Sequence, residues 1–118
     1  MSNPAERGAA LSVLVPVVER PDDLREIHGA LLGEIAKLGR SFEFLYLVSA
    51  EFPDSLAQAI ELRESDPARV RVLRFSRPVS EAVALTAGFE RARGEVFITF
   101  PAYFDELERL TTRGPLAR

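Results

Sequence analysis

The apolar run LSVLVPV at residues 11–17 restricts the possible folds of this chain more than any other stretch. A run that is apolar on both faces is typical of a strand buried in the middle of a parallel sheet, with helices covering it above and below. A strand of this kind requires alternating helices and strands after it. It also places any ligand beyond its carboxyl end.

The segment after this run carries the clearest helix pattern in the sequence. Pro21 is suited to a first helical turn, and Asp22 and Asp23 complement the positive end of the helix dipole. Gly39 provides a stop at the other end. Apolar residues recur between them at helical spacing and are expected on one buried face: Leu24, Ile27, Leu31, Ile35 and Leu38.

The remaining periodicities predict three more strands and three more helices in alternation. The strands are expected at residues 42–48, 70–75 and 95–100. The helices are expected from Pro53 to the turn at 65–67, from an N-cap at Ser80 to a stop at Gly94, and over residues 103–112.

Two of these segments also support predictions about which of their faces are buried. The 70–75 strand, VRVLRF, alternates apolar residues with arginine, which predicts an edge strand with one wet face. The helix after Ser80 is expected to bury one face, with Gly88 allowing a close approach to the sheet. The residues predicted on that face are Leu85, Gly88, Phe89 and Ala92.

Right-handed crossovers would arrange these elements as an α/β three-layer sandwich around a four-stranded parallel sheet in the order 3-2-1-4. The length of 118 residues suits one domain. We therefore expect a flexible leader at 1–10, a single domain at 11–113 and a tail at 114–118.

Composition excludes several classes of protein. The chain is 47% hydrophobic and 28% charged, which is typical of a globular domain, and its net charge of −3 offers no basic surface for nucleic acid or an anionic membrane. It has no cysteine, and its apolar runs are far shorter than the roughly 20 residues of a membrane span. With no apolar signal region in residues 1–10, a cytoplasmic location is expected.

Familiar ligand motifs are missing from the strand ends. The sequence contains neither G-x-G-x-x-G after the first strand nor a P-loop G-x-x-x-x-G-K-[ST]. The aspartate cluster and lysine of a phosphoacceptor domain are also missing. His28, the only histidine, falls within the first helix and is interpreted as structural or solvent-facing.

Four segments together resemble a known family: PVVERPDDL at 16–24, FEFLYLVSAEFPDSL at 42–56, DPARVRVLRFSR at 66–77 and EAVALTAGFERARGEVFITFPAY at 81–103. They are similar to the nucleotide-binding half of family 2 glycosyltransferases with the GT-A fold, a Rossmann-like nucleotide-diphospho-sugar transferase fold. The nearest type is the dolichol- or polyprenyl-phosphate mannosyl- and glucosyltransferases. The string ALTAGFERARGEV at 84–96 is the most specific part. The resemblance implies half of a GT-A fold, truncated before the acceptor-binding part.

The resemblance also implies where a nucleotide would bind. The family positions that hold it correspond here to Pro16, Val18, Arg20, Ser49, Glu51, Arg77 and Ala102. Several have lost the family's residue type. The tyrosine, asparagine and glutamate after the proline are replaced by Val18, Glu19 and Arg20, and the paired aspartates by Val48 and Ser49. A lysine before the third helix is replaced by Glu81.

The family's metal-binding D-x-D aligns with Pro101 and Tyr103, which supply no anionic oxygen for Mg²⁺ or Mn²⁺. Asp105 and Glu106 lie just beyond and are the only metal-ligand candidates at that position. No catalytic residue and no cofactor are therefore expected. If the protein is active, Mg²⁺ or Mn²⁺ would accompany a nucleotide sugar.

Three hypotheses about the function remain open. The first is a catalytically inactive scaffold or interaction subunit in glycan or polysaccharide biosynthesis, either a homodimer through the exposed edge of the fourth strand or a partner of an active glycosyltransferase. The second is an active glycosyltransferase, or a piece of one, with an unorthodox site that includes Glu19, Glu51, Asp105 or Glu106. The third is a nucleotide sensor without turnover that uses Arg20, Arg74 and Arg77.

Overall fold

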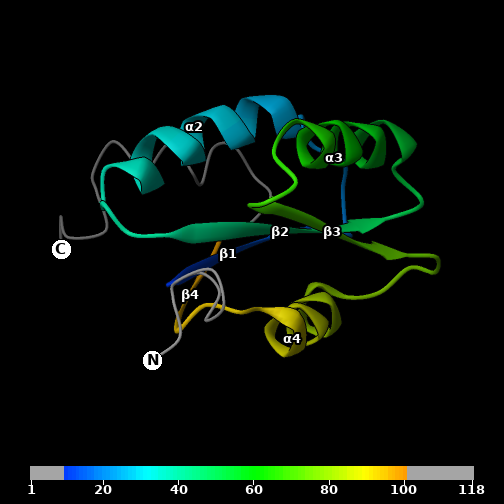
Figure 1. Cartoon of the computed structure of the whole chain (residues 1–118). Coiled ribbons are helices and arrows are strands. Elements are labelled where there is room, and N and C mark those ends of the chain that lie inside the picture. The colour runs from blue at the N-terminus through cyan, green and yellow to red at the C-terminus, as the bar shows by residue number, and fades with distance from the viewer. Residues whose placement is uncertain (1–9, 101–118) are drawn as a thin grey trace, which may run out of the picture.

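The computed structural model describes residues 10–100. These residues form four strands and three helices in strict alternation, as Figure 1 shows. The strands are β1 (Leu11–Val17), β2 (Phe42–Ser49), β3 (Val70–Phe75) and β4 (Val96–Thr99). The helices are α2 (Leu24–Ala36), α3 (Pro53–Ser65) and α4 (Glu81–Arg91). None of the helices within residues 10–100 combines the length and apolar character needed to cross a bilayer.

The sheet has the predicted topology. Its strand order is β3-β2-β1-β4, and every pairing is parallel. β1 is central and all seven of its residues are buried, which confirms the interpretation of LSVLVPV as a strand covered on both faces. The predicted α/β architecture and strand order are therefore correct.

Helices cover both faces of the sheet, so the fold has three layers. In Figure 1, α2 and α3 lie on one face and α4 on the other. Beneath α2 and α3 is the larger apolar cluster, which includes Val13, Phe44 and Leu31. The smaller cluster beneath α4 is built around Leu14, Leu45 and Leu47. A Cβ at Gly88 would lie 2.7 Å from Leu14 Cδ2, so glycine at this position allows the predicted close approach.

The predicted bounds of α2 need correction. Asp23 caps the helix by accepting hydrogen bonds from the amides of Arg25 and Glu26, so Pro21 and Asp22 precede it instead of forming its first turn. At the other end the helix stops at Ala36, and Leu38 lies beyond it with 53% of its surface exposed. Gly39 has a φ of +66° and reverses the chain, as its position after the helix suggests.

The predictions for α4 and its surroundings hold in part. Ser80 is the N-cap, and its side chain accepts a hydrogen bond from the Val83 amide. Phe89 does not belong to the buried face: it is 41% exposed, and its ring lies 5.4 Å from that of Phe97 in β4. Ala84 is buried in its place. Gly94 does not end the helix, which stops at Arg91.

The edge strands also differ in detail from prediction. β3 has the predicted bounds and an edge position, but its arginines do not share one environment. Arg74 is exposed, whereas Arg71 is half-buried and pairs with Glu43. β4 covers Val96–Thr99 and not the full 95–100 range. The helix predicted over 103–112 and the segments at 1–9 and 114–118 lie outside the described residues.

A buried carboxylate, Glu43, organises the amino ends of the strands. It is 1% exposed and accepts hydrogen bonds from Ser12 Oγ at 2.7 Å, Arg71 Nη1 at 3.0 Å and the Arg93 amide at 2.7 Å. Burial alone would raise the pKa of Glu43, but the Arg93, Ser12 and Arg71 donors together hold this pKa below its usual range. The carboxylate is therefore charged and joins β1, β2, β3 and the segment between α4 and β4.

His28 is a structural residue, in line with its position in the first helix. It is 9% exposed, its Nδ1 lies 2.8 Å from the Tyr46 hydroxyl and its ring packs edge-on against Phe44. Burial lowers the pKa of His28, so the ring is held in its neutral form within the core.

Candidate functional site

The carboxyl ends of three neighbouring strands lie level with one another. Val17 at the end of β1 pairs with Val48 in β2, and Val48 pairs with Arg74 in β3. The loops that follow these strands therefore meet at one edge of the sheet, together with the amino ends of the helices. In open parallel sheets this edge is the usual place for a ligand, and we call it the crevice.

Three of the predicted nucleotide-binding residues are buried here. Pro16 and Val18 lie inside the molecule, and Val18, at 4% exposure, packs in the apolar cluster beneath α4. Ser49 is fully buried, and its Oγ accepts a hydrogen bond from the Glu51 amide at 3.2 Å. Pro16 and Val18 thus contribute hydrocarbon to the interior, and the Ser49 oxygen helps to close its own loop.

Arg20, Glu51 and Arg77 are exposed in the loops after β1, β2 and β3. They share the edge of the sheet at which the resemblance places a nucleotide. The other predicted positions, Ala102, Asp105 and Glu106, lie outside the described residues, as do Pro101 and Tyr103.

A feature that the sequence did not reveal is the contact between Glu19 and α4. Glu19 Oε2 accepts a hydrogen bond from the backbone amide of Glu81, the first residue of the helix, at 3.0 Å. The Ser80 hydroxyl accepts from the Val83 amide at 3.2 Å. Two amides at the amino end of α4 are thus already bonded to side chains of the protein itself.

The two carboxylates beside this helix end are close enough to influence each other. Burial raises the pKa of Glu81, and the charge of Glu19 raises it further. Because 62 residues separate Glu19 from Glu81, no spacing rule links them in the sequence. The crevice therefore presents acidic groups where a helix amino end would otherwise favour an anion.

The loop after β1 is tied to α3 on the other side of the sheet. Ser55 is buried and exchanges two hydrogen bonds with Asp22, accepting from its amide at 3.1 Å and donating to its carbonyl at 2.8 Å. Gln58 Oε1 accepts from the Leu24 amide at 2.7 Å. Burial raises the pKa of Asp22, although the positive charge of Arg20 acts in the opposite direction. These contacts fix the start of α2 against α3.

Residues 10–100 contain no group of three or more acidic or histidine side chains placed to hold a metal ion. The sequence-predicted metal positions fall after Phe100, outside that range. Within the described part of the chain, the carboxylates at the crevice instead bond to backbone or face solvent.

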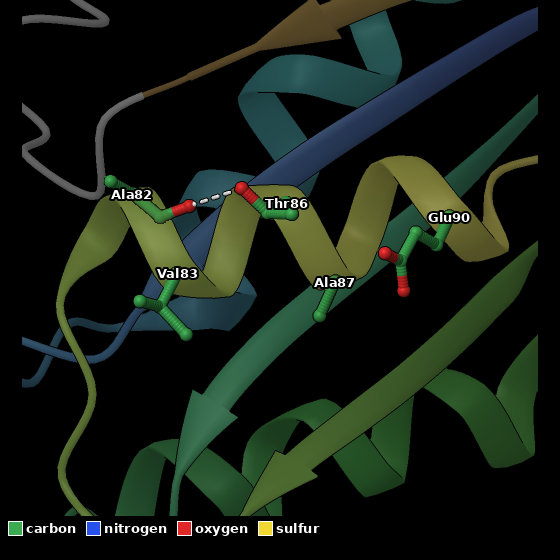
Figure 2. A pocket seen from close by; sticks show the side chains of 5 residues that line it. All are labelled: Ala82, Val83, Thr86, Ala87 and Glu90. Carbon is green, nitrogen blue, oxygen red and sulfur yellow. Dashed lines mark hydrogen bonds between the residues drawn. The ribbon is translucent and has the colours of Figure 1, made fainter.

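A shallow hollow of about 360 Å³ lies on the outer face of α4 and is lined by Ala82, Val83, Thr86, Ala87 and Glu90. Figure 2 shows these side chains along one helix, with the Thr86 hydroxyl turned toward the Ala82 carbonyl. That hydrogen bond is 2.9 Å long. Because one helix supplies the whole lining and Thr86 is engaged within it, the hollow offers little to orient a ligand.

Comparison with known proteins shows what this chain is similar to. It is 28% identical over 107 residues to an undecaprenyl-phosphate 4-deoxy-4-formamido-L-arabinose transferase of Klebsiella pneumoniae, a match covering 87% of this chain and 33% of the relative. The protein of the same name from Pseudomonas aeruginosa is 31% identical over 108 residues, covering 87% of this chain and 32% of the relative. An uncharacterized glycosyltransferase of Synechocystis is 25% identical over 92 residues, covering 78% of this chain and 29% of the relative.

The chain thus spans about a third of the length of these curated relatives. No protein-family model matches it. The relatives are all glycosyltransferases, which confirms the resemblance carried by the sequence motifs. The crevice described above belongs to a glycosyltransferase-like domain.

Proposed function

We propose that this glycosyltransferase-like domain has lost catalysis and acts as a scaffold or interaction subunit in the synthesis of glycans or polysaccharides. The curated relatives are named as glycosyltransferases, two of them as undecaprenyl-phosphate sugar transferases, and this supports the sugar-transfer setting. The chain spans about a third of those proteins, and the proposed role is that of this part alone.

The observation that carries the loss of catalysis is the pairing of Glu19 with the amino end of α4. A sugar nucleotide brings a diphosphate, and free amides at a helix amino end favour such a group. Here the Glu81 amide already donates to the Glu19 carboxylate at 3.0 Å, and the Glu81 side chain adds a second acidic group. A diphosphate approaching this helix would meet like charge.

The residue types at the aligned family positions support the same conclusion. Val48 and Ser49, in place of paired aspartates, are fully buried. Pro101 and Tyr103, in place of D-x-D, supply no anionic oxygen for a divalent cation. A transferase must stabilise charge on a departing nucleoside diphosphate, and these positions hold no group suited to that task.

The surface that supports an interaction role is the outer side of β4. This strand lies at the end of the sheet in the described residues. Val96 is 44% exposed and Phe97 is 45% exposed, with the exposed Phe89 ring 5.4 Å from Phe97. An edge strand with exposed apolar side chains favours pairing with another chain. We propose a second copy of this chain or an active glycosyltransferase as the partner.

Isothermal titration calorimetry tests the loss of catalysis. The protein is titrated with UDP-sugars and GDP-sugars, with and without Mn²⁺, and we expect no binding heat in any combination. Metal-dependent binding in the micromolar range would contradict the proposal in favour of an active enzyme. Metal-independent binding that disappears in Arg77→Ala would contradict it in favour of a nucleotide sensor.

Light scattering tests the interaction surface. We expect the wild-type chain to be a dimer that Phe97→Asp converts to a monomer. Val83→Asp is the matched control, because Val83 is 53% exposed on α4 but lies outside the β4 edge, and it should leave the dimer intact. A monomeric wild-type chain would exclude the homodimer, and equal effects of the two variants would exclude β4 as the interface.

A further inference from the structure

Strand β4 is held to the sheet differently from the other strands. All residues of β1 and β2 are buried, whereas none of the residues Val96–Thr99 is. β4 pairs with β1 over only four positions, from Leu11 to Leu14. On the face beneath α2, Ile98 and Phe100 are only partly buried against the main apolar cluster. Apolar burial therefore contributes little to the anchoring of β4.

Polar contacts hold the segment that leads into β4. The Arg93 amide donates to Glu43 Oε2 at 2.7 Å, and the Gly94 amide donates to Ser12 Oγ at 2.7 Å. Ser12 Oγ in turn donates to the same carboxylate oxygen at 2.7 Å. Arg71 Nη1 bridges Glu43 Oε1 at 3.0 Å and the Arg91 carbonyl at 2.7 Å. The buried Glu43 carboxylate thus fixes the backbone of this segment at three points: directly at the Arg93 amide, through Ser12 at the Gly94 amide, and through Arg71 at the Arg91 carbonyl.

The same segment passes close to β1 at Gly94, where no larger residue would fit. A Cβ at Gly94 would lie 2.6 Å from Ser12 Oγ and 2.7 Å from the Ser12 amide nitrogen. The connection between α4 and β4 is therefore pressed directly onto β1. This close contact depends on the orientation of Ser12, which Glu43 sets through its hydrogen bond.

We propose that residues 92–100 form a separately opening unit of the fold and that the carboxylate of Glu43 is its latch. With the latch made, β4 remains paired with β1. When the charge of Glu43 is removed, the unit opens while β1, β2 and β3 stay folded beneath α2 and α3. The inference does not depend on the proposed function, because it concerns the local stability of this chain alone.

Two physical arguments support a latch of this kind. Hydrogen bonds to a buried charge are stronger than neutral ones, and leaving their partners unpaired costs more than the bonds themselves contribute. Proteins also open locally in contiguous units, and the units with least apolar burial open first. β4 has the least burial of the four strands, so loss of the latch should act there before it acts elsewhere. Opening would also free the apolar edge of β1 for another strand.

Native-state hydrogen exchange, followed by NMR on the whole chain at constant pH, tests the proposal. The amides of Val96 and Phe100, which donate to Ala10 and Leu14, report on β4. The amides of Ala50 and Leu56, which donate to Phe75 and Phe52, report on the rest of the fold. In Glu43→Gln we expect the two β4 amides to exchange at least tenfold faster, with the other two changed by less than twofold.

Arg25→Ala is the control, because it removes an exposed ion pair of 2.8 Å between α2 and α3 and should leave all four rates unchanged. An equal acceleration of all four amides in Glu43→Gln would overturn the proposal, since Glu43 would then support the whole fold. No acceleration would overturn it as well. If Glu43→Gln does not fold, Ser12→Ala keeps the carboxylate and removes one arm of the latch. The same selective pattern is expected there, and a uniform one again overturns the proposal.

Discussion

Gly88 offers the sharpest test of how α4 packs on the sheet. Alanine is the better helix former by about 1 kcal/mol in a helix interior, so Gly88→Ala would stabilise an unpacked helix. In this protein the new Cβ would lie 2.7 Å from Leu14 Cδ2 and 3.1 Å from Leu47 Cδ1. Ordinary carbon contacts are roughly 3.5–4.0 Å, so one of these side chains would have to move.

Both leucines are fully buried, so a shift of either side chain must be accommodated by its packed neighbours. Forcing an extra methyl group into a packed core costs about 1–3 kcal/mol, which exceeds the gain in helix propensity. We therefore expect Gly88→Ala to lower the free energy of unfolding by about 1 kcal/mol. Gly88→Val should lower it further, since two more methyl groups would have to fit.

The chain supplies its own control in α2. Gly29 is also in a helix interior, is exposed, and has nothing within 4 Å of the position of a Cβ. Gly29→Ala should therefore raise the free energy of unfolding by about 1 kcal/mol. Urea denaturation monitored by circular dichroism measures both changes, and each kcal/mol corresponds to roughly 4–8 °C in Tm for a small domain. If Gly88→Ala stabilises the protein as much as Gly29→Ala does, α4 is not held against Leu14 and the reasoning fails.

Three further predictions concern the buried polar contacts and the helix cap. Burial lowers the pKa of His28, so as the pH falls through about 6.5 the unfolded chain takes up a proton before the folded one and stability decreases. His28→Gln should flatten that part of the curve of unfolding free energy against pH. An unchanged curve would show that protonation of His28 does not cause this pH dependence. Tyr46→Phe should cost about 1 kcal/mol at neutral pH, because it removes the hydroxyl that lies 2.8 Å from His28 Nδ1; equal urea midpoints for variant and wild type would count against that bond. Asp23→Ala should also cost about 1 kcal/mol through loss of the α2 cap. The same change at Asp54, an exposed carboxylate in the first turn of α3, where no side chain caps the helix, should cost less in the same assay because only its charge near the helix end is lost.

The apolar framework of this protein resembles that of a glycosyltransferase more closely than the residues at the carboxyl ends of its strands do. The apolar residues that build a parallel sheet with level carboxyl ends are all in place. At that edge, Val48 is buried, and Glu19 in the loop after β1 accepts a hydrogen bond from the first amide of α4; under the proposed loss of catalysis, both are replacements of the family's polar residues. A framework can persist without its chemistry, because packing requires only apolar residues of suitable size, whereas a site requires particular groups at particular positions.

The order of the elements can be predicted from local patterns in the amino-acid sequence. Strands and helices follow from periodicities of two and 3.6 residues, and the Ser80 cap and the Gly39 reversal follow from local chemistry. The right-handedness of crossovers restricts the possible strand orders, and 3-2-1-4 is one that it allows. These rules act over a few residues or apply to all chains, so they can be used without coordinates.

Which polar residues come into contact depends on the three-dimensional fold and could not be predicted from local patterns. Glu43 reaches the Arg93 amide 50 residues away, and Glu19 reaches the Glu81 amide 62 residues away. The periodicity that placed Phe89 on the buried face could not show that its ring would instead lie beside Phe97. Periodicity identifies which side of a helix is apolar. The neighbours that the fold brings to that side determine whether a residue there becomes core, part of a polar network or surface.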